Sequence, residues 1–214
     1  MLKTARLFLI VITFPSLFTG SAVGQENQDE YSGSFGLDIG YFLPVGNWTT
    51  HRYAEGVDQF QGGLMFGAEL EARIFKIPIG LSYNYIRLSV EDWVDYAAQR
   101  GDPISASASM GVYGLTVKYY FLKKKPHLMV LELGGSYVTL KGHENFAGYS
   151  YDYNFLNPGL GFILVLGYNY LFNEHIALAI KAKALFRLEG ISYADGQTND
   201  IIGLPLTAGI KYFF

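Results

Sequence analysis

Cysteine is absent from the 214-residue chain. A disulfide framework, a thiolate metal site and a cysteine nucleophile are therefore all excluded. The same absence excludes a lipid-anchored bacterial lipoprotein, because that class carries its lipid on a cysteine at the mature N-terminus. Any structural staple or reactive group in this protein must come from other side chains.

Charge is also scarce. Charged residues make up only 16% of the chain, and the formal net charge is −3. Loss of the first 24 residues would remove Lys3 and Arg6 with no acidic residue, which leaves a net charge of −5. An acidic chain repels a phosphate backbone, so we expect no nucleic-acid partner.

No hydrophobic run is long enough for a comfortable membrane helix. The longest candidate within the body of the chain, Gly159–Phe172, is short, interrupted by glycines and rich in strand-forming residues. An N-terminal run, Leu7–Phe18, is shorter still and contains Pro15. A membrane anchor at the N-terminus is the alternative that this run leaves open.

The N-terminal run has the layout of a secretory signal peptide. Two positive residues precede the apolar core, and small residues follow it before Gln25. We therefore predict a signal peptide at residues 1–24, a short segment at 25–31 and one domain at 32–214.

What the sequence does contain is aromatic residues and glycine, with 17 tyrosines, 16 phenylalanines and 25 glycines. The apolar residues alternate with period two, as in Leu64–Ile74, where every second residue is apolar. Residues between them are small or charged, such as Gly67, Glu69 and Arg73. A strand places these two rows on opposite faces, so one face is apolar throughout.

Eight such runs occur, at residues 33–44, 62–75, 77–89, 106–121, 127–140, 158–171, 175–188 and 201–214. Short connections lie near Lys76 and at 122–127 and 172–175, and longer ones at 45–61, 90–105, 141–157 and 189–200. An even number of strands with short and long connections in alternation is the layout of a transmembrane β-barrel. The prediction is an all-β fold, an eight-stranded antiparallel up-and-down transmembrane β-barrel.

A soluble, lipocalin-like barrel with its apolar row turned inward is the competing interpretation. Two features favour the membrane barrel. The polar row is rich in glycine, which suits a crowded interior, at Gly67, Gly80, Gly114, Gly134, Gly161 and Gly209. The apolar row also ends in aromatic residues, as interfacial girdles do; these are Tyr83, Tyr85, Tyr119, Phe121, Tyr168 and Tyr170.

Two segments resemble the small outer-membrane β-barrel proteins of Gram-negative-type bacteria. The C-terminal TAGIKYFF is similar to their insertion signal, with Thr207, Gly209, Tyr212 and Phe214 at the matching positions. GYFLPVGNW, at residues 40–48, resembles their first strand and loop. The resemblance implies an exported protein of the cell outer membrane with periplasmic termini, and recognition of its last strand by barrel-assembly machinery and periplasmic chaperones.

Charges of both signs fall on the row that a membrane barrel turns inward. They are Asp38, Glu69, Glu71, Arg73, Lys118, Glu132, Lys181, Lys183, Arg187, Glu189 and Lys211. Buried charges need partners, so these residues are expected to form a paired network. The network could act as a selective channel or as a plug; the narrow lumen of eight strands favours the plug.

Catalytic, cofactor and metal motifs are not evident, and we predict no enzyme activity and no cofactor. A lipid-modifying enzyme remains an alternative, which would require His51 or His143 to lie near a serine and a carboxylate. A narrow solute channel is another. The preferred role is membrane-structural or surface interaction, through loop aromatics with no identified ligand: Trp48, Tyr53, Trp93, Tyr96, Tyr149, Tyr151 and Tyr153.

Overall fold

The structure is a computed structural model, and it describes residues 31–45, 60–101, 104–146, 149–154, 159–187, 191–192, 198–199 and 202–214. Gly33–Phe214 forms one compact unit. The predicted signal peptide and the segment at 25–30 lie outside the described residues. Among those described, no helix is long and apolar enough to cross a membrane.

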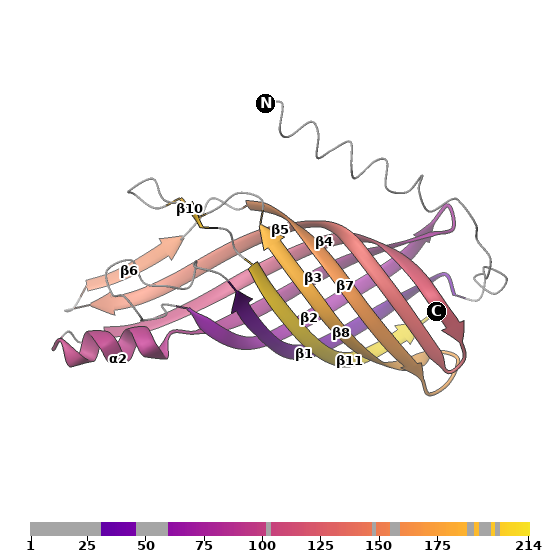
Figure 1. Cartoon of the computed structure of the whole chain (residues 1–214), viewed down its shortest axis with the longest axis horizontal. Helices are drawn as coiled ribbons and strands as arrows, with labels where there is room; N and C mark the ends of the chain where they lie inside the picture. The colour runs from indigo at the N-terminus through magenta and orange to yellow at the C-terminus, as the bar shows by residue number, and fades with distance from the viewer. Residues whose placement is uncertain are drawn as a thin grey trace, which may run out of the picture. The chain divides into compact units, whose positions relative to one another are not determined.

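Eight antiparallel strands close into a barrel (Figure 1). Each pairs with the next along the chain, and the last pairs with the first, so the barrel itself has no free edge. The strands are β1 (Gly33–Val45), β2 (Gln61–Ile74), β3 (Ile77–Ser89), β4 (Ile104–Lys124), β5 (His127–Phe146), β7 (Gly159–Leu171), β8 (Ile176–Arg187) and β11 (Ile202–Phe213). The predicted fold class is confirmed.

The strand register fixes the tilt of the barrel. The stagger is found by stepping from Ser109 of β4 to its register partner on β3, and so on around the barrel. The path returns to β4 at Tyr119, so the stagger is ten residues. With usual strand spacings, this stagger gives a tilt of about 40° and a rise of about 2.5 Å per residue along the barrel axis. Transmembrane barrels have strands tilted by about 35–45°.

One end of the barrel, which we call the turn end, carries only short connections. They are Phe75–Lys76, Lys125–Pro126 and Phe172–His175. In the last of these, Asn173 Oδ1 accepts hydrogen bonds from the backbone N–H groups of His175 and Ile176, both at 2.8 Å. The chain closes at this end, where Gly33 and Phe214 exchange two backbone hydrogen bonds of 3.1 Å.

The opposite end, the loop end, carries the longer connections and differs from prediction (Figure 1). Residues 141–157 were expected to be a loop, but β5 continues to Phe146 and pairs with β6 (Tyr149–Asn154). β4 likewise begins at Ile104 and pairs with this extension of β5. These three strands form a sheet that continues beyond the barrel wall. Two short strands, β9 (Ile191–Ser192) and β10 (Thr198–Asn199), also lie in a predicted loop.

The segment 90–105, also predicted as a loop, contains the helix α2 (Glu91–Gln99). Acidic residues in its first turn favour the helix dipole. Just past the end of the helix, Gly101 has a φ of +81°, the left-handed conformation that commonly terminates helices. Val90 and Val94 pack against the interior of the barrel.

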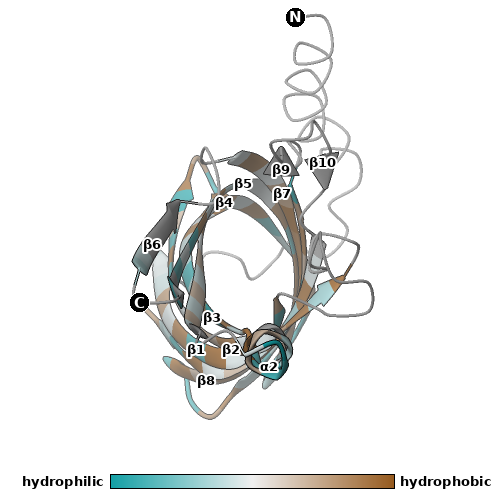
Figure 2. Ribbon diagram, turned by 90° about the vertical axis from the view of Figure 1, so that its left-hand side faces the viewer, coloured by the Kyte–Doolittle hydropathy of each residue, from teal (hydrophilic) through white to brown (hydrophobic). Residues whose placement is uncertain are grey.

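Figure 2 shows hydrophobic residues in brown along the barrel strands, and many of their side chains are exposed on the outside of the barrel. On β1 alone, Leu37, Ile39 and Leu43 are 56%, 52% and 51% exposed. Outward aromatics gather near the turn end, as predicted for Tyr119, Phe121 and Tyr170. This arrangement is the reverse of a soluble barrel, which buries its apolar row.

Candidate functional site

Six charged residues meet inside the half of the barrel nearest the turn end. This lysine–glutamate cluster consists of Glu69, Glu71, Lys118, Glu132, Lys181 and Lys211, all buried. Lys118 Nζ contacts Glu69, lies 3.1 Å from Glu71 Oε2 and 3.6 Å from Glu132 Oε1. The cluster contains equal numbers of acids and bases, so it can be electrically neutral.

The other two lysines link the same carboxylates from different strands. Lys211 Nζ lies 2.8 Å from Glu71 Oε2 and 3.5 Å from Glu69 Oε1. Lys181 contacts Glu69 and lies 3.8 Å from Glu132 Oε1. Since β2, β4, β5, β8 and β11 all contribute, the cluster ties together strands that are not neighbours.

Neutral side chains complete the cluster. Tyr120 donates a hydrogen bond of 2.8 Å to Glu71 Oε2, and Ser34 donates one of 3.2 Å to the same oxygen. Thr116 donates to Glu132 Oε2 at 3.4 Å. Toward the turn end, the ring of buried Phe213 lies 5.1 Å from Lys211 Nζ. Phe213 breaks the alternation of its strand's polar row because it faces the interior.

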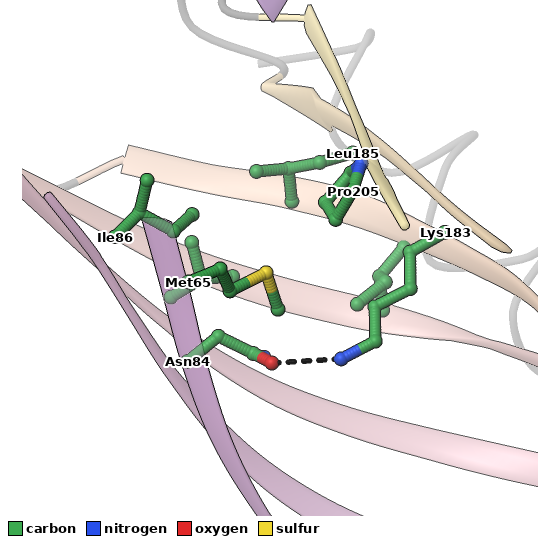
Figure 3. Close-up of a pocket in the computed structure, with 8 residues that line it drawn as sticks. Met65, Asn84, Ile86, Lys183, Leu185 and Pro205 are labelled. Atoms are coloured by element: carbon green, nitrogen blue, oxygen red, sulfur yellow. Dashed lines mark hydrogen bonds between the residues drawn. The ribbon is translucent and has the colours of Figure 1, made fainter. Parts of the chain in front are cut away.

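A second, smaller charged group lies nearer the middle of the barrel. Lys183 Nζ donates to Asn84 Oδ1 at 2.8 Å (Figure 3). It also donates to Asp38 Oδ2 at 3.2 Å. Beside it lies a small cavity with room for about one water molecule, lined by Met65, Asn84, Ile86, Val112, Ile163, Lys183, Leu185 and Pro205. The cavity is therefore too small for an organic ligand.

Between this cavity and the loop end the interior is apolar, a feature that was not predicted from the sequence. This apolar upper core consists of Phe42, Phe60, Met65, Ile86, Leu88, Val90, Ala108, Met110, Val112, Val138, Leu140 and Leu185. The signal was present in the sequence, because Met65, Met110 and Leu140 fall on the same inward row as the charges. Buried apolar side chains thus pack the described part of the lumen toward the loop end.

The remaining predicted lumen charges lie apart from the cluster. Arg187 is buried on β8 close to Gly159, at the loop end. Arg73 is half-buried at the turn end. Glu189 lies outside the described residues.

The predicted assembly residues occupy both faces of β11. Tyr212 and Phe214 are 48% and 50% exposed on the outward face. Thr207 is buried, and Gly209 also faces inward, beside Asp38.

The aromatics predicted on loops lie largely on regular elements. Trp93 and Tyr96 belong to α2, and Tyr149, Tyr151 and Tyr153 belong to β6. Tyr96 accepts a hydrogen bond of 3.1 Å from Arg100, and Tyr149 is 67% exposed. Trp48 and Tyr53 lie outside the described residues.

Three tyrosines form a row across the outward face of β3, β4 and β5. Tyr83 pairs in register with Tyr113, and Tyr113 with Tyr137, with ring centroids 4.8 Å and 6.2 Å apart. Four residues further toward the loop end, Arg87, Ser109 and Lys141 occupy the next polar row in the same register. We call these the tyrosine row and the basic row.

One row further on, His143 of β5 lies opposite two residues relevant to hydrolysis. Ser107 of β4 is its register partner on one side, and Asp152 of β6 on the other. His51, the other candidate histidine, lies outside the described residues. In the part of the chain that the structure describes, no group of three acidic or histidine side chains could hold a metal ion.

Comparisons with known proteins bear on the fold. No protein-family model matches the chain, and no curated protein matches its sequence. The barrel is similar to Neisserial surface protein A, with 12% identity over 86% of this chain and 97% of that one and a TM-score of 0.56. It is also similar to the outer membrane protein OprG from Pseudomonas aeruginosa, with 16% identity over 87% and 98% and a TM-score of 0.52.

A third similar structure is a major outer membrane protein from Thermus thermophilus, with 12% identity over 86% of this chain and all of that one, and a TM-score of 0.51. At these identities the likeness shows the fold alone. The chain has the fold of the small eight-stranded outer-membrane β-barrels, which confirms the resemblance seen in the sequence at the level of fold.

Proposed function

We propose that this chain is an integral protein of a bacterial outer membrane, with its turn end in the periplasm and its loop end outside the cell. Its role is membrane-structural or surface interaction, carried by the β4–β5–β6 extension and α2. The observation that supports this most directly is the distribution of polarity, with exposed apolar side chains around the outside and buried ion pairs within.

Physical chemistry favours lipid around this barrel. Exposed apolar rows on every strand would be costly in water, whereas strands that satisfy their backbone hydrogen bonds in a closed barrel are stable in hydrocarbon. Along β4, Ser109 lies about 25 Å above Tyr119, given about 2.5 Å per residue. That height equals the apolar band of outer-membrane barrels, about 25 Å.

The filled lumen supports a role other than transport. The lysine–glutamate cluster occupies one half and the apolar upper core the other. Neither leaves a continuous path for water in the described part of the chain. A surface role instead draws on the sheet and helix that extend past the barrel wall.

Export and assembly form part of the same proposal. A signal peptide at residues 1–24 would direct export, and the short segment at 25–31 would remain in the periplasm. The outward aromatics of β11, Tyr212 and Phe214, would be recognised by barrel-assembly machinery, with Thr207 and Gly209 completing the signal.

Gel migration of the outer-membrane fraction, with and without boiling, tests the proposal. A detergent-resistant barrel migrates at a different position before boiling. Protease added to intact cells should cut only in the connections at the loop end, and not in the turns at the other end. Recovery in the soluble periplasmic fraction, with no heat-dependent shift, would contradict the proposal.

A second candidate function rests on the alignment of Ser107, His143 and Asp152 across three adjacent strands. Serine, histidine and a carboxylate are the groups of a hydrolytic triad. His143 lies about 15 Å above Tyr137 along the barrel axis, six residues at about 2.5 Å each. A hydrolase here would act on an ester outside the bilayer, rather than on acyl chains within it.

A fluorophosphonate probe on the purified protein separates the two candidates. A hydrolase would be labelled at Ser107, and both Ser107→Ala and His143→Gln would abolish the labelling. Absence of labelling in the folded, heat-modifiable protein would rule out the hydrolase function and would be consistent with the surface role.

A further inference from the structure

The basic row lies at the level where lipid headgroups would begin. Arg87, Ser109 and Lys141 are four residues beyond the tyrosine row, which is about 10 Å along the barrel axis. The apolar band of about 25 Å that starts at Tyr119 ends at the level of Ser109, so the tyrosine row lies in the upper part of the hydrocarbon and the basic row at its edge. Long side chains at this edge reach the phosphate and sugar groups of the outer leaflet, an argument that rests on the membrane location proposed above.

The three side chains of the basic row face outward side by side. Arg87 and Lys141 are exposed, and Ser109 lies directly between them in register. Neighbouring strands are about 4.8 Å apart, so the two cations are about 10 Å apart across the serine. Two long basic side chains at that spacing can converge on one phosphate or bind two phosphates of one headgroup.

Neither cation is neutralised by an acidic side chain in the described part of the chain. The ion pairs found there involve the interior lysines and carboxylates, not Arg87 or Lys141. One acidic position, Asp152, lies opposite His143, one row further from the membrane. Their positive charges are therefore available to lipid headgroups and are not neutralised within the sheet.

The barrel surface is apolar at the same height on β1 and β7, which lie on either side of the basic row. Counting along the register places Leu43 and Leu160 within about 2 Å of the height of Arg87; they are 51% and 60% exposed. Among the described residues at this height, the exposed cations thus lie on the β3–β4–β5 wall. A general basic rim would encircle the barrel, whereas this one marks a single lipid-facing site.

We infer that the basic row binds the phosphate groups of a phosphorylated glycolipid in the outer leaflet. Arg87 and Lys141 supply the charge, Ser109 supplies a hydroxyl donor between them, and the tyrosine row packs against the top of the acyl chains. Bound there, the lipid anchors the wall from which the β4–β5–β6 extension continues. Arginine suits this role because its planar fork matches two phosphate oxygens.

The test uses the full barrel in phosphatidylcholine nanodiscs containing lipid A, with EDTA present to remove bridging cations. Two probes are compared, bisphosphorylated lipid A and lipid A stripped of phosphate, and retained lipid is counted by native mass spectrometry. Wild type should retain the phosphorylated form selectively. Arg87→Gln with Lys141→Gln should lower its affinity by roughly thirtyfold, since each basic residue near an anionic surface contributes about fivefold.

Matched variants make the outcome decisive. Lys76→Gln with Lys124→Gln removes two exposed cations at the turn end and should leave selectivity unchanged, and Arg87→Lys should retain most of it. Equal retention of both lipids, or an equal loss in the turn-end variant, would overturn the site. Displacement by millimolar inorganic phosphate would overturn a lipid as its ligand. Heat-dependent gel migration in phosphatidylcholine without lipid A tests membrane insertion separately.

Discussion

Two of the interior lysines, Lys118 and Lys181, contact carboxylates from more than one strand. Lys118 of β4 contacts Glu69 and Glu71 of β2 and Glu132 of β5. A buried charge is tolerated only while its partners remain, because desolvation costs several kcal/mol per ion. The cluster therefore makes individual residues sensitive, although it need not make the whole barrel more stable than an apolar interior would.

Lys118→Met should destabilise the barrel by about 3–5 kcal/mol, because it leaves three carboxylates with two lysines. The urea midpoint of unfolding in lipid vesicles measures this. Adding Glu71→Gln restores the balance of charge, so the double variant should recover a large part of the loss. Exposed Lys124→Met should change stability by less than about 0.5 kcal/mol. Equal effects of the two single methionine variants would contradict a paired cluster.

Two adjacent glycines on β5 offer a test of interior crowding. A methyl group on Gly134 would meet the backbone of β4, with Thr116 Cα only 2.7 Å away, whereas on Gly135 the nearest atom, Gly161 O, is 4.0 Å away. Gly134→Ala should therefore cost about 1–3 kcal/mol. Gly135→Ala should be neutral or slightly stabilising. The same unfolding measurement compares them, and a larger loss for Gly135→Ala would reverse the assignment of faces.

At the level of elements, the alternation of apolar residues predicted the eight barrel strands because each has one face against lipid. The β6 strand, YSYDYN, was missed although its tyrosines alternate with polar residues, because they were interpreted as loop aromatics. The end of β5 was missed because it carries no apolar row. The helix α2 was missed because its acidic residues resemble a solvated loop. Its helical signal was nevertheless present, with Val90, Val94 and Ala97 at the spacing of one helical face.

The β2–β3 turn is the element whose sequence fits its backbone least well. Phe75 and Lys76 have φ values of +51° and +69°, a pair typical of a type I′ hairpin turn that favours Asn-Gly. Lys76→Gly should stabilise the barrel by about 1 kcal/mol, because glycine adopts this conformation without strain. Lys124→Gly, at the end of β4, should not stabilise it. Unfolding midpoints of both variants would decide, and a loss in Lys76→Gly would contradict the turn type.

The last strand should govern assembly rather than final stability. Tyr212→Ser with Phe214→Ser removes the outward aromatics that we propose as the insertion signal. The amount of folded protein in the outer membrane should fall several-fold, while the purified variant still folds in detergent. Leu206→Ser with Ile210→Ser removes two apolar residues from the same outward face and serves as the control. Equal depletion in both variants would indicate lost hydrophobicity rather than a specific signal.

At the scale of the whole molecule, the interior has two zones that differ in chemistry. The sequence predicted inward charges, and the structure brings six of the eleven candidates into one cluster, with Asp38 and Lys183 paired above it. Which carboxylate meets which lysine depends on barrel stagger, which alternation alone does not determine. The apolar upper core was overlooked because the inward row was considered only for its charges.

The lysine–glutamate cluster and the apolar upper core follow one another along the lumen, and together they should make the barrel non-conducting. An ion would have to displace the partners of the lysine–glutamate cluster and then cross a dry apolar section, which excludes hydrated ions by dewetting. Wild-type protein in a planar lipid bilayer should therefore show no steady conductance. Met110→Ser with Leu140→Ser wets the apolar section but leaves the cluster in place, so it should also remain silent. Stepwise conductance of the wild-type protein would mean that the cluster rearranges, and that it acts as a gate instead of a plug.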